Sequence, residues 1–381
     1  MPVQVLGGKN ALAESGGLLR ALGNRCLVVT GRQSAKASGA LDELDALFAR
    51  QGISYAVFDE IKPNPLVSDC YRAAARAKAV GAQFVIGIGG GSPLDSAKVV
   101  ALLATNELSV RELYGLEWPA PPLPSVLIGT TAGTGSEVTM VSVLTQDDTG
   151  RKKSVTAPAL YARFAVADAR YTASCGYGVT LSCALDALCH AVEGYFSARA
   201  NVLTDAVAVG AVHQLVRAIG RLAAEEAYRA GGAAIPIELR EELYSASLMA
   251  GMVLNGCGAG FPHAMGYILT EDFGVPHGMA CAAFLPAYIQ RAYRCAPAKA
   301  LALGVRTERL AELVEACLDL PPLVLTAEQI EGYLPRFDGN KNFRNSPGEP
   351  GAEDARAILT ARFGDRYGED REDEDIDAAT D

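Results

Sequence analysis

The first half of the chain alternates short runs of apolar, mostly β-branched residues with segments in which apolar residues recur at helical spacing. The runs that predict strands cover residues 26–30, 55–59, 84–88, 125–128 and 164–168. Helical spacing appears between them, for example at 70–80 and 96–104. Strand and helix repeated in this order predict an α/β domain, with a parallel sheet covered by helices on both faces.

The pattern changes at about residue 180. Long amphipathic segments rich in Ala, Leu and Glu follow one another, as at 203–221, 237–254 and 306–317, and strand signals disappear. We therefore expect an α/β domain over residues 1–178 and an all-helical domain over residues 179–364. A tail at 365–381 holds nine acids and two arginines, a composition typical of a disordered, solvated segment.

Composition excludes several classes of protein. The net charge of −10 over 381 residues falls to about −3 without the tail, and no basic stripe indicates a nucleic-acid partner. Apolar stretches are short and interrupted, and the N-terminus lacks the pattern of a signal peptide, so we expect no membrane association. Nine scattered cysteines without a C-x-x-C pair indicate reduced thiols in a cytoplasmic protein.

A run of three glycines follows the predicted strand at 84–88. Gly89, Gly90 and Gly91 allow the backbone to approach a bulky anion, and the helix that follows presents unpaired N–H groups to it. Ser92 and Asp95 have the spacing of a capping box at the start of this helix. An ordinary capped helix after a tight turn explains the same residues equally well.

A second loop, at 129–137, crowds glycines and hydroxyl side chains together after another predicted strand. Thr130, Thr131 and Thr134 can hydrogen-bond to a phosphate or a ribose, although an ordinary loop has a similar composition. Two such loops, each after an apolar predicted strand, favour a nucleotide site at the carboxyl ends of a parallel sheet.

Only four histidines occur in the chain. Asp186 and His190 are four residues apart, so a helix places both on one face, as in a metal-binding pair or on a polar helix face. His263 stands at a predicted helix start, and His277 in a turn containing Gly and Pro. One carboxylate and three imidazoles would suit Fe(II), Zn(II) or a similar ion. His213 lies in an ordinary amphipathic pattern and is interpreted as structural.

Four motifs in this order resemble the iron-containing (group III) alcohol dehydrogenases. They are the stretches 89–98, 130–137 and 186–193, and the pair His263 and His277 followed by Gly278. The resemblance extends over about residues 3–363. It implies a dinucleotide-binding α/β domain and an all-helical domain with a metal in the cleft between them. By this resemblance the metal ligands are Asp186, His190, His263 and His277.

The resemblance also implies the residues that bind the dinucleotide. Gly90, Gly91 and Ser92 would hold the pyrophosphate, Asp95 would lie near the nicotinamide amide, Thr130, Thr131 and Thr134 would line the adenosine side, Lys152 would lie near the nicotinamide ribose, and Asn64 belongs to a smaller matching motif at 62–65.

Two positions depart from the family pattern. Tyr267 stands where a second histidine often follows the third ligand, and we interpret its phenol as a wall of the pocket rather than a proton relay. Gly31 replaces an acid that often binds the adenosine ribose, and Arg32 follows it, with Ser34 and Lys36 nearby. Losing the carboxylate and gaining a guanidinium suits a 2′-phosphate, so we expect NADP(H) rather than NAD(H).

The expected function is hydride transfer between a nicotinamide dinucleotide and a small alcohol, aldehyde or ketone, assisted by Fe(II) or Zn(II). Alternatives in the same superfamily are a glycerol or polyol dehydrogenase and a lyase similar to dehydroquinate synthase. A non-catalytic structural homologue is a third interpretation. A homodimer is expected from the resemblance alone.

Overall fold

The computed structural model describes residues 2–365, so the predicted acidic tail lies almost entirely outside the described residues. Contacts among its residues divide the chain into two compact units. Unit 1 comprises Met1–Tyr195 and Arg199–Gly258, and unit 2 comprises Phe196–Ala198 and Ala259–Asp381. The last strand of the α/β part, β8, ends at Ala167, and the first long helix after it begins at Tyr177. The expected domain boundary between residues 178 and 179 stays a prediction.

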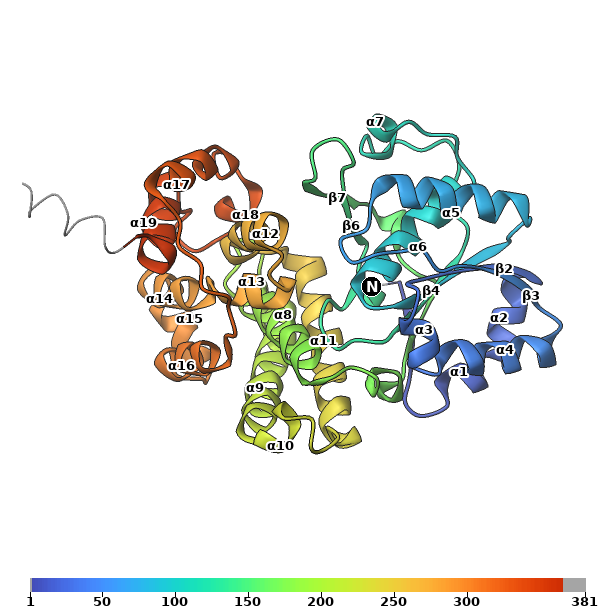
Figure 1. Cartoon of the computed structure of the whole chain (residues 1–381), viewed down its shortest axis with the longest axis horizontal. Coiled ribbons are helices and arrows are strands. Elements are labelled where there is room, and N and C mark those ends of the chain that lie inside the picture. The colour runs from blue at the N-terminus through green and yellow to red at the C-terminus, as the bar shows by residue number, and fades with distance from the viewer. Residues whose placement is uncertain (1, 366–381) are drawn as a thin grey trace, which may run out of the picture. The chain divides into compact units, whose positions relative to one another are not determined.

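Unit 1 contains a parallel sheet of six strands, which confirms the predicted fold class (Figure 1). The strand order is β1-β8-β5-β4-β2-β3. Their bounds are β1 Gln4–Gly7, β2 Arg25–Thr30, β3 Ser54–Phe58, β4 Phe84–Gly89, β5 Ser125–Gly129 and β8 Phe164–Ala167. The sequence reading missed β1 and a separate antiparallel hairpin of β6 (Val141–Thr145) and β7 (Lys152–Thr156).

Helices cover both faces of this sheet, as the alternation of strands and helices predicts (Figure 1). On β2, Leu27 and Val29 face one apolar core and Cys26 and Val28 face the other, because successive side chains point to opposite faces. The helices of this part are α1 Ala11–Glu14, α2 Gly16–Leu22, α3 Ser34–Ala37, α4 Ala40–Gln51, α5 Val67–Ala79, α6 Gly91–Leu103 and α7 Val110–Leu113, with 3₁₀ turns η1 Ser136–Val138, η2 Pro158–Leu160 and η3 Ala169–Thr172.

Four helices complete unit 1. They are α8 Tyr177–Tyr195, α9 Val202–Ala224, α10 Glu226–Arg229 and α11 Ile237–Cys257. Helices α8, α9 and α11 pack against one another, and α11 also contacts η1 and η3. Among the described residues, α9 is the one helix long and apolar enough to cross a membrane, with a mean hydropathy of 1.4. It packs against α8 and α11, and 33% of its most apolar 18-residue window is buried.

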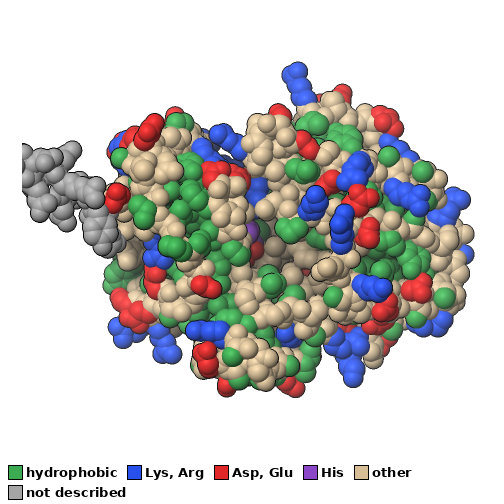
Figure 2. Space-filling view, in the orientation of Figure 1, with side chains coloured by type: hydrophobic (Ala, Val, Ile, Leu, Met, Phe, Trp, Pro, Cys, Tyr) green, Lys and Arg blue, Asp and Glu red, His purple; other side chains and the backbone are tan. Residues whose placement is uncertain are grey.

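In its described residues, unit 2 contains helices and no strands, apart from one isolated bridge between Leu325 and Gly364. Its elements are α12 Phe261–Phe273, α13 His277–Ala282, α14 Leu285–Cys295, α15 Pro297–Ala302, α16 Thr307–Cys317, α17 Ala327–Tyr333, η4 Leu334–Arg336, α18 Lys341–Arg344 and α19 Ala352–Phe363. On the face shown in Figure 2, basic and acidic side chains are interspersed with apolar ones.

Candidate functional site

The glycine run forms a tight turn between β4 and α6. Gly89 has a φ of 152°, and a Cβ there would lie 2.6 Å from Cγ of Pro93, so glycine is required. Helix α6 begins at Gly91 with Gly90 as its N-cap and no side-chain cap. The predicted capping box of Ser92 and Asp95 is therefore wrong. The helix starts two residues earlier than a serine cap at position 92 requires, which places Ser92 inside its first turn.

The second predicted loop packs directly on this turn. The Thr130 amide donates to the Gly89 carbonyl at 2.9 Å. A Cβ on Gly90 would lie 3.1 Å from Oγ1 of Thr131, and one on Gly91 would lie 2.7 Å from Cγ2 of Thr134. The structure therefore brings together the two loops that the sequence singled out, and the glycines are required for the close approach.

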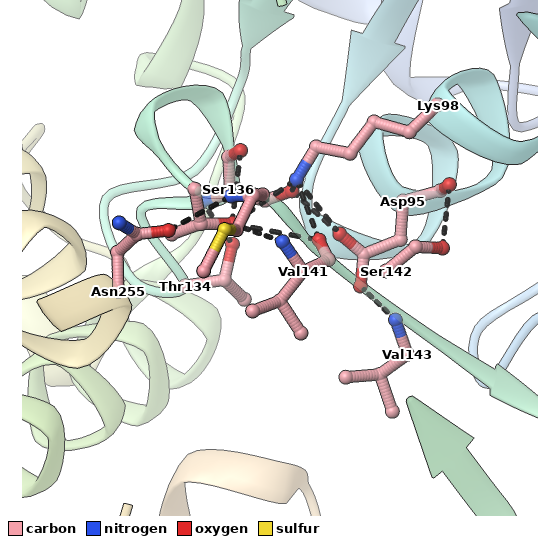
Figure 3. Close-up of polar contacts among 10 residues, drawn as sticks. Asp95, Lys98, Thr134, Ser136, Val141, Ser142, Val143 and Asn255 are labelled. Carbon is pink, nitrogen blue, oxygen red and sulfur yellow. Dashed lines mark hydrogen bonds and ion pairs between the residues drawn. The ribbon is translucent and has the colours of Figure 1, made fainter. Parts of the chain in front are cut away.

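Both carboxylate oxygens of Asp95 accept hydrogen bonds from other residues of the chain (Figure 3). Oδ1 accepts a hydrogen bond from the Ser136 hydroxyl at 2.5 Å, and Oδ2 accepts one from the Val143 amide at 2.8 Å. Oδ1 also lies 3.6 Å from Nζ of Lys98. These contacts give Asp95 a structural role, and the predicted position near a nicotinamide amide stays a prediction.

Lys98 is a site residue that the sequence reading missed. Its side chain is fully buried, and its ammonium group donates to the Val141 carbonyl at 2.7 Å, the Ser136 hydroxyl at 2.8 Å and the Thr139 hydroxyl at 3.1 Å. Burial raises the pKa of the Asp95 carboxyl and lowers the pKa of the Lys98 ammonium, and each charge opposes part of this effect on the other.

Three further predicted nucleotide residues lie at loops and strand ends of unit 1. Gly31 follows β2, and a Cβ there would lie 3.1 Å from the Ile61 carbonyl oxygen. Asn64, in the loop after β3, has a φ of 56°, a left-handed conformation that Asn tolerates. Lys152 is the first residue of β7 and pairs with Thr145. The contact of Gly31 with Ile61 brings the loops after β2 and β3 together.

Unit 1 also carries the first predicted pair of metal ligands. Asp186 and His190 lie on α8 one turn apart, and Nε2 of His190 is 3.8 Å from Oδ1 of Asp186. Both side chains are buried. The helix predicted from their spacing is therefore present, and it places both groups on one face. His213, interpreted as structural, lies half-buried on α9.

Unit 2 carries the second predicted pair. His263 lies in the first turn of α12, and His277 is the first residue of α13 rather than part of a turn. Their rings are 5.5 Å apart between centroids, in an edge-to-face arrangement. The Tyr267 ring lies nearly parallel to that of His277, with centroids 5.6 Å apart. This position fits the predicted role of Tyr267 as a wall beside the imidazole.

Cys281 belongs to the same cluster and was missed because His277 was read as a turn residue. Within unit 2, donor atoms of His263, His277 and Cys281 lie within 4.8 Å of one another. The Cys281 sulfur is 3.7 Å from Nδ1 and 3.8 Å from Nε2 of His277. The four-residue spacing from His277 to Cys281 would have indicated a shared helix face.

Family models match both parts of the chain. The model of iron-containing alcohol dehydrogenase matches residues 2–169, and the model of the C-terminal region of the Fe-containing alcohol dehydrogenase family matches residues 180–328. The chain belongs to the iron-containing alcohol dehydrogenase family. Membership confirms the resemblance drawn from the four motifs and makes the chain an alcohol oxidoreductase by family.

Three relatives are about one third identical to this chain over the residues that align. Alcohol dehydrogenase 4 of Schizosaccharomyces pombe is 33% identical over 290 residues, which are 74% of this chain and 65% of that protein. The 1,3-propanediol dehydrogenase of Klebsiella pneumoniae is 33% identical over 74% of this chain and 68% of its own length. The sulfoacetaldehyde reductase of Bilophila wadsworthia is 34% identical over 74% of this chain and 72% of its own length.

Solved structures match over nearly the whole chain. An iron-containing alcohol dehydrogenase from Thermotoga maritima superposes with a TM-score of 0.86 at 37% identity, covering 95% of this chain and 98% of that one. A 1,3-propanediol oxidoreductase superposes with a TM-score of 0.82 at 28% identity, covering 95% and 98%. These neighbours extend the likeness beyond the regions aligned with the named relatives.

Proposed function

We propose that this chain is a metal-dependent, NAD(P)-linked enzyme that interconverts a small alcohol and its aldehyde or ketone. The observation that carries the proposal is the set of donors on α8, α12 and α13, of which Asp186, His190 and His263 are buried and His277 is half-buried. Asp186 and His190 are paired in unit 1, and His263 and His277 are paired in unit 2. We propose that the two pairs bind the same divalent ion.

The chemistry of these donors fits such an ion. One carboxylate oxygen and three imidazole nitrogens form a set that suits Fe(II) and Zn(II) equally, since both bind borderline nitrogen and oxygen ligands. When bound, the cation supplies a Lewis acid for the substrate oxygen, and the nicotinamide supplies or accepts the hydride. Placing the donors on helices fixes their directions before any ligand binds.

The chain's own residues bind and orient the dinucleotide. The start of α6 presents N–H groups beside Gly90 and Gly91, where a pyrophosphate can approach without meeting a side chain. Thr131 and Thr134 pack against this turn and can donate hydroxyl hydrogen bonds from the second loop. Buried side chains around Asp186 and His190 exclude water from this part of α8.

We propose that the preferred coenzyme is NADP(H). Gly31 stands at the end of β2, where a carboxylate would repel a 2′-phosphate, and the exposed Arg32 follows it. Ser34 and Lys36 lie on the short helix α3 directly after this turn. A guanidinium, a hydroxyl and an ammonium group within five residues form a donor set that suits a phosphate dianion.

The substrate class is proposed from the named relatives. The names of two relatives refer to 1,3-propanediol and to sulfoacetaldehyde, both small molecules with an alcohol or aldehyde group. A glycerol or polyol substrate is compatible with the same donor set, and a dehydroquinate synthase-like lyase would differ by producing no net NAD(P)H. We also propose a cytoplasmic homodimer. The cytoplasmic location is proposed from the nine scattered cysteines, which include no C-x-x-C pair.

The deciding experiment measures bound metal and turnover in the same samples. Asp186→Ala and His263→Ala are expected to lose stoichiometric Fe or Zn and to abolish oxidation of 1,3-propanediol and of C2–C6 alcohols. NADPH binding should be retained, because the glycine turn is distant in sequence and made by other elements of unit 1. His213→Ala, on α9, is the control and should keep both metal and turnover.

Two results would overturn the proposal. One is full turnover in chelator-treated protein whose metal content has been shown to be negligible. The other is retention of stoichiometric metal when Asp186 and His263 are replaced together. A panel of alcohols, diols, aldehydes and ketones with both coenzymes separates a dehydrogenase from a lyase. Only the dehydrogenase produces a net change in the absorbance of the coenzyme, because the lyase produces no net NAD(P)H.

A further inference from the structure

The loop between β5 and β6 is held at its start by the end of β4 and at its far end by α6. At its start, the Thr130 amide donates to the Gly89 carbonyl at 2.9 Å. At its far end, the Lys98 ammonium group donates to Ser136, Thr139 and Val141. The segment between these anchors contains Thr131 and Thr134, which touch the glycine turn. One buried side chain thus connects α6 with the end of this loop.

The three contacts of Lys98 use up the hydrogen-bonding capacity of an ammonium group. Lys has three N–H donors, and each has one acceptor at 2.7–3.1 Å. The acceptors come from residues 38 to 43 positions away, on η1, the loop after it and the first residue of β6. Figure 3 shows the ammonium group pointing into this loop, with Asp95 beside it.

Asp95 extends the same network to the hairpin. Its carboxylate accepts from Ser136 and from the Val143 amide, and its backbone carbonyl accepts from the Ser142 hydroxyl at 2.8 Å. On the opposite side of the loop, Asn255 on α11 accepts from the Met140 amide at 2.9 Å. Helices α6 and α11 therefore hold the loop end from two sides.

Burying the charge of this lysine costs free energy. A fully buried ammonium group must lose its water, and here the nearest carboxylate oxygen is 3.6 Å away, too far for a direct hydrogen bond. An apolar residue of similar size would fill the space without that cost, although it would leave three acceptors unsatisfied. The hydrogen bonds to the loop are therefore the feature that only lysine provides.

We propose that Lys98 is a positioning residue that fixes residues 130–143, the loop and the start of β6, against the glycine turn in the geometry that binds the coenzyme. This rests on the proposed dinucleotide site. Lys98 acts through Ser136, Thr139 and Val141 and has no contact with the coenzyme itself. Asp95 has the separate task of neutralising the buried ammonium and anchoring β6.

The test separates positioning from charge balance by comparing Lys98→Met with Asp95→Asn/Lys98→Met. The methionine keeps the volume but removes the three donors. The double variant also removes the carboxylate that Lys98→Met leaves without its cation. Lys78→Met, on α5 where Lys78 pairs with Glu107 at 2.5 Å, is the matched control. NADPH and NADH are the probes, measured by calorimetric Kd, by KM and kcat, and by amide hydrogen exchange of residues 130–143.

In Lys98→Met we expect faster exchange across residues 130–143 and a Kd for the coenzyme raised about tenfold, with kcat at saturating coenzyme largely kept. In the double variant the thermal midpoint of unfolding should be higher than in Lys98→Met, since the uncompensated carboxylate is gone. The Kd for the coenzyme and the exchange rate of residues 130–143 should stay raised. If Lys98→Met fails to fold, Thr139→Val removes one acceptor at nearly constant shape and should show a smaller change in the same direction.

Two results would overturn the assignment. Recovery of coenzyme Kd in the double variant would mean that Lys98 only neutralises Asp95. Exchange in Lys98→Met equal to that in Lys78→Met would mean that Lys98 does not hold the loop. If the unmodified protein bound neither NADPH nor NADH, the proposed dinucleotide site would fail, and the exchange measurement would still decide whether Lys98 orders the loop.

Discussion

Gly266 on α12 packs directly against Cys281 on α13. A Cβ added to Gly266 would lie 2.9 Å from the backbone nitrogen, Cα and Sγ of Cys281. Cys281 in turn lies one turn after His277 on the same helix, with its sulfur beside the imidazole. The absence of a side chain at position 266 therefore sets how closely the helices that carry His263 and His277 approach.

We predict that Gly266→Ala separates α12 from α13 and weakens the metal site. Overpacking of this kind lowers the free energy of unfolding by about 1–3 kcal/mol. Bound Fe or Zn per chain, measured after dialysis against a weak chelator, should fall. Gly220→Ala on α9 is the control, because its Cβ would meet nothing within 4 Å. Unchanged metal content in Gly266→Ala would show that the helix spacing does not govern the ligands.

A second prediction concerns the glycine turn. Gly91→Ala places a Cβ 2.7 Å from Cγ2 of Thr134, so the loop of residues 130–140 must move away from the start of α6. We expect the Kd for NADPH to rise by about tenfold or more, since the pyrophosphate loses both the open backbone and its neighbouring hydroxyls. Gly17→Ala on α2, where a Cβ meets nothing within 4 Å, should bind NADPH normally. Equal Kd values in the two variants would contradict this reading.

The turn itself was predictable because its signals are local. A buried strand, three glycines and a helix follow one another within twenty residues, and each has a conformational reason that the sequence states directly. The helix spacing of Asp186 and His190 was predictable for the same reason. The strand β1 was missed because four residues with little burial carry too weak a pattern, although they pair with β8 at the other end of the α/β part.

The contacts of Asp95 and Lys98 could not be predicted from local sequence patterns. The spacing of Ser92 and Asp95 imitates a capping box, yet the carboxylate turns instead to Ser136 and Val143, more than forty residues away. Lys98 looks like an ordinary polar position of an amphipathic helix until β6 and η1 cover it. Cys281 was missed because Pro276 and Gly278 around His277 indicated a turn, whereas Pro276 is the N-cap of α13.

A third prediction tests the coenzyme preference. Arg32→Ala removes the guanidinium expected to meet the 2′-phosphate, so the ratio of kcat/KM for NADPH over NADH should fall by about tenfold or more. The value for NADH itself should change little. Arg76→Ala, on the exposed side of α5, is the matched control and should leave the ratio unchanged. A ratio favouring NADH in the unmodified protein would show that Gly31 and Arg32 do not select the phosphate.

A fourth prediction follows from the buried pair of Glu137 and Tyr244. The Tyr244 hydroxyl donates to Oε1 of Glu137 at 2.9 Å, and both side chains are buried in unit 1. Burial raises the pKa of the Glu137 carboxyl above its ordinary value of 4.5, although the hydrogen bond from Tyr244 and the charge of Lys98 oppose this. The folded state therefore holds this proton more tightly than the unfolded state does.

The direction of the pH dependence follows from that difference. The stabilisation from the bound proton is fully present below pH 4.5, and it is lost as the pH rises toward and through the raised pKa of the folded state. Glu137→Gln keeps an acceptor for Tyr244 but cannot ionise. Urea unfolding from acid to mildly alkaline pH should therefore show the wild-type protein losing stability relative to Glu137→Gln as the pH rises.

Glu112→Gln supplies a control of opposite sign, because hydrogen bonds from Ser109 lower the pKa of the exposed Glu112 carboxyl. Parallel curves for wild type and Glu137→Gln would mean that Glu137 titrates normally in the folded protein.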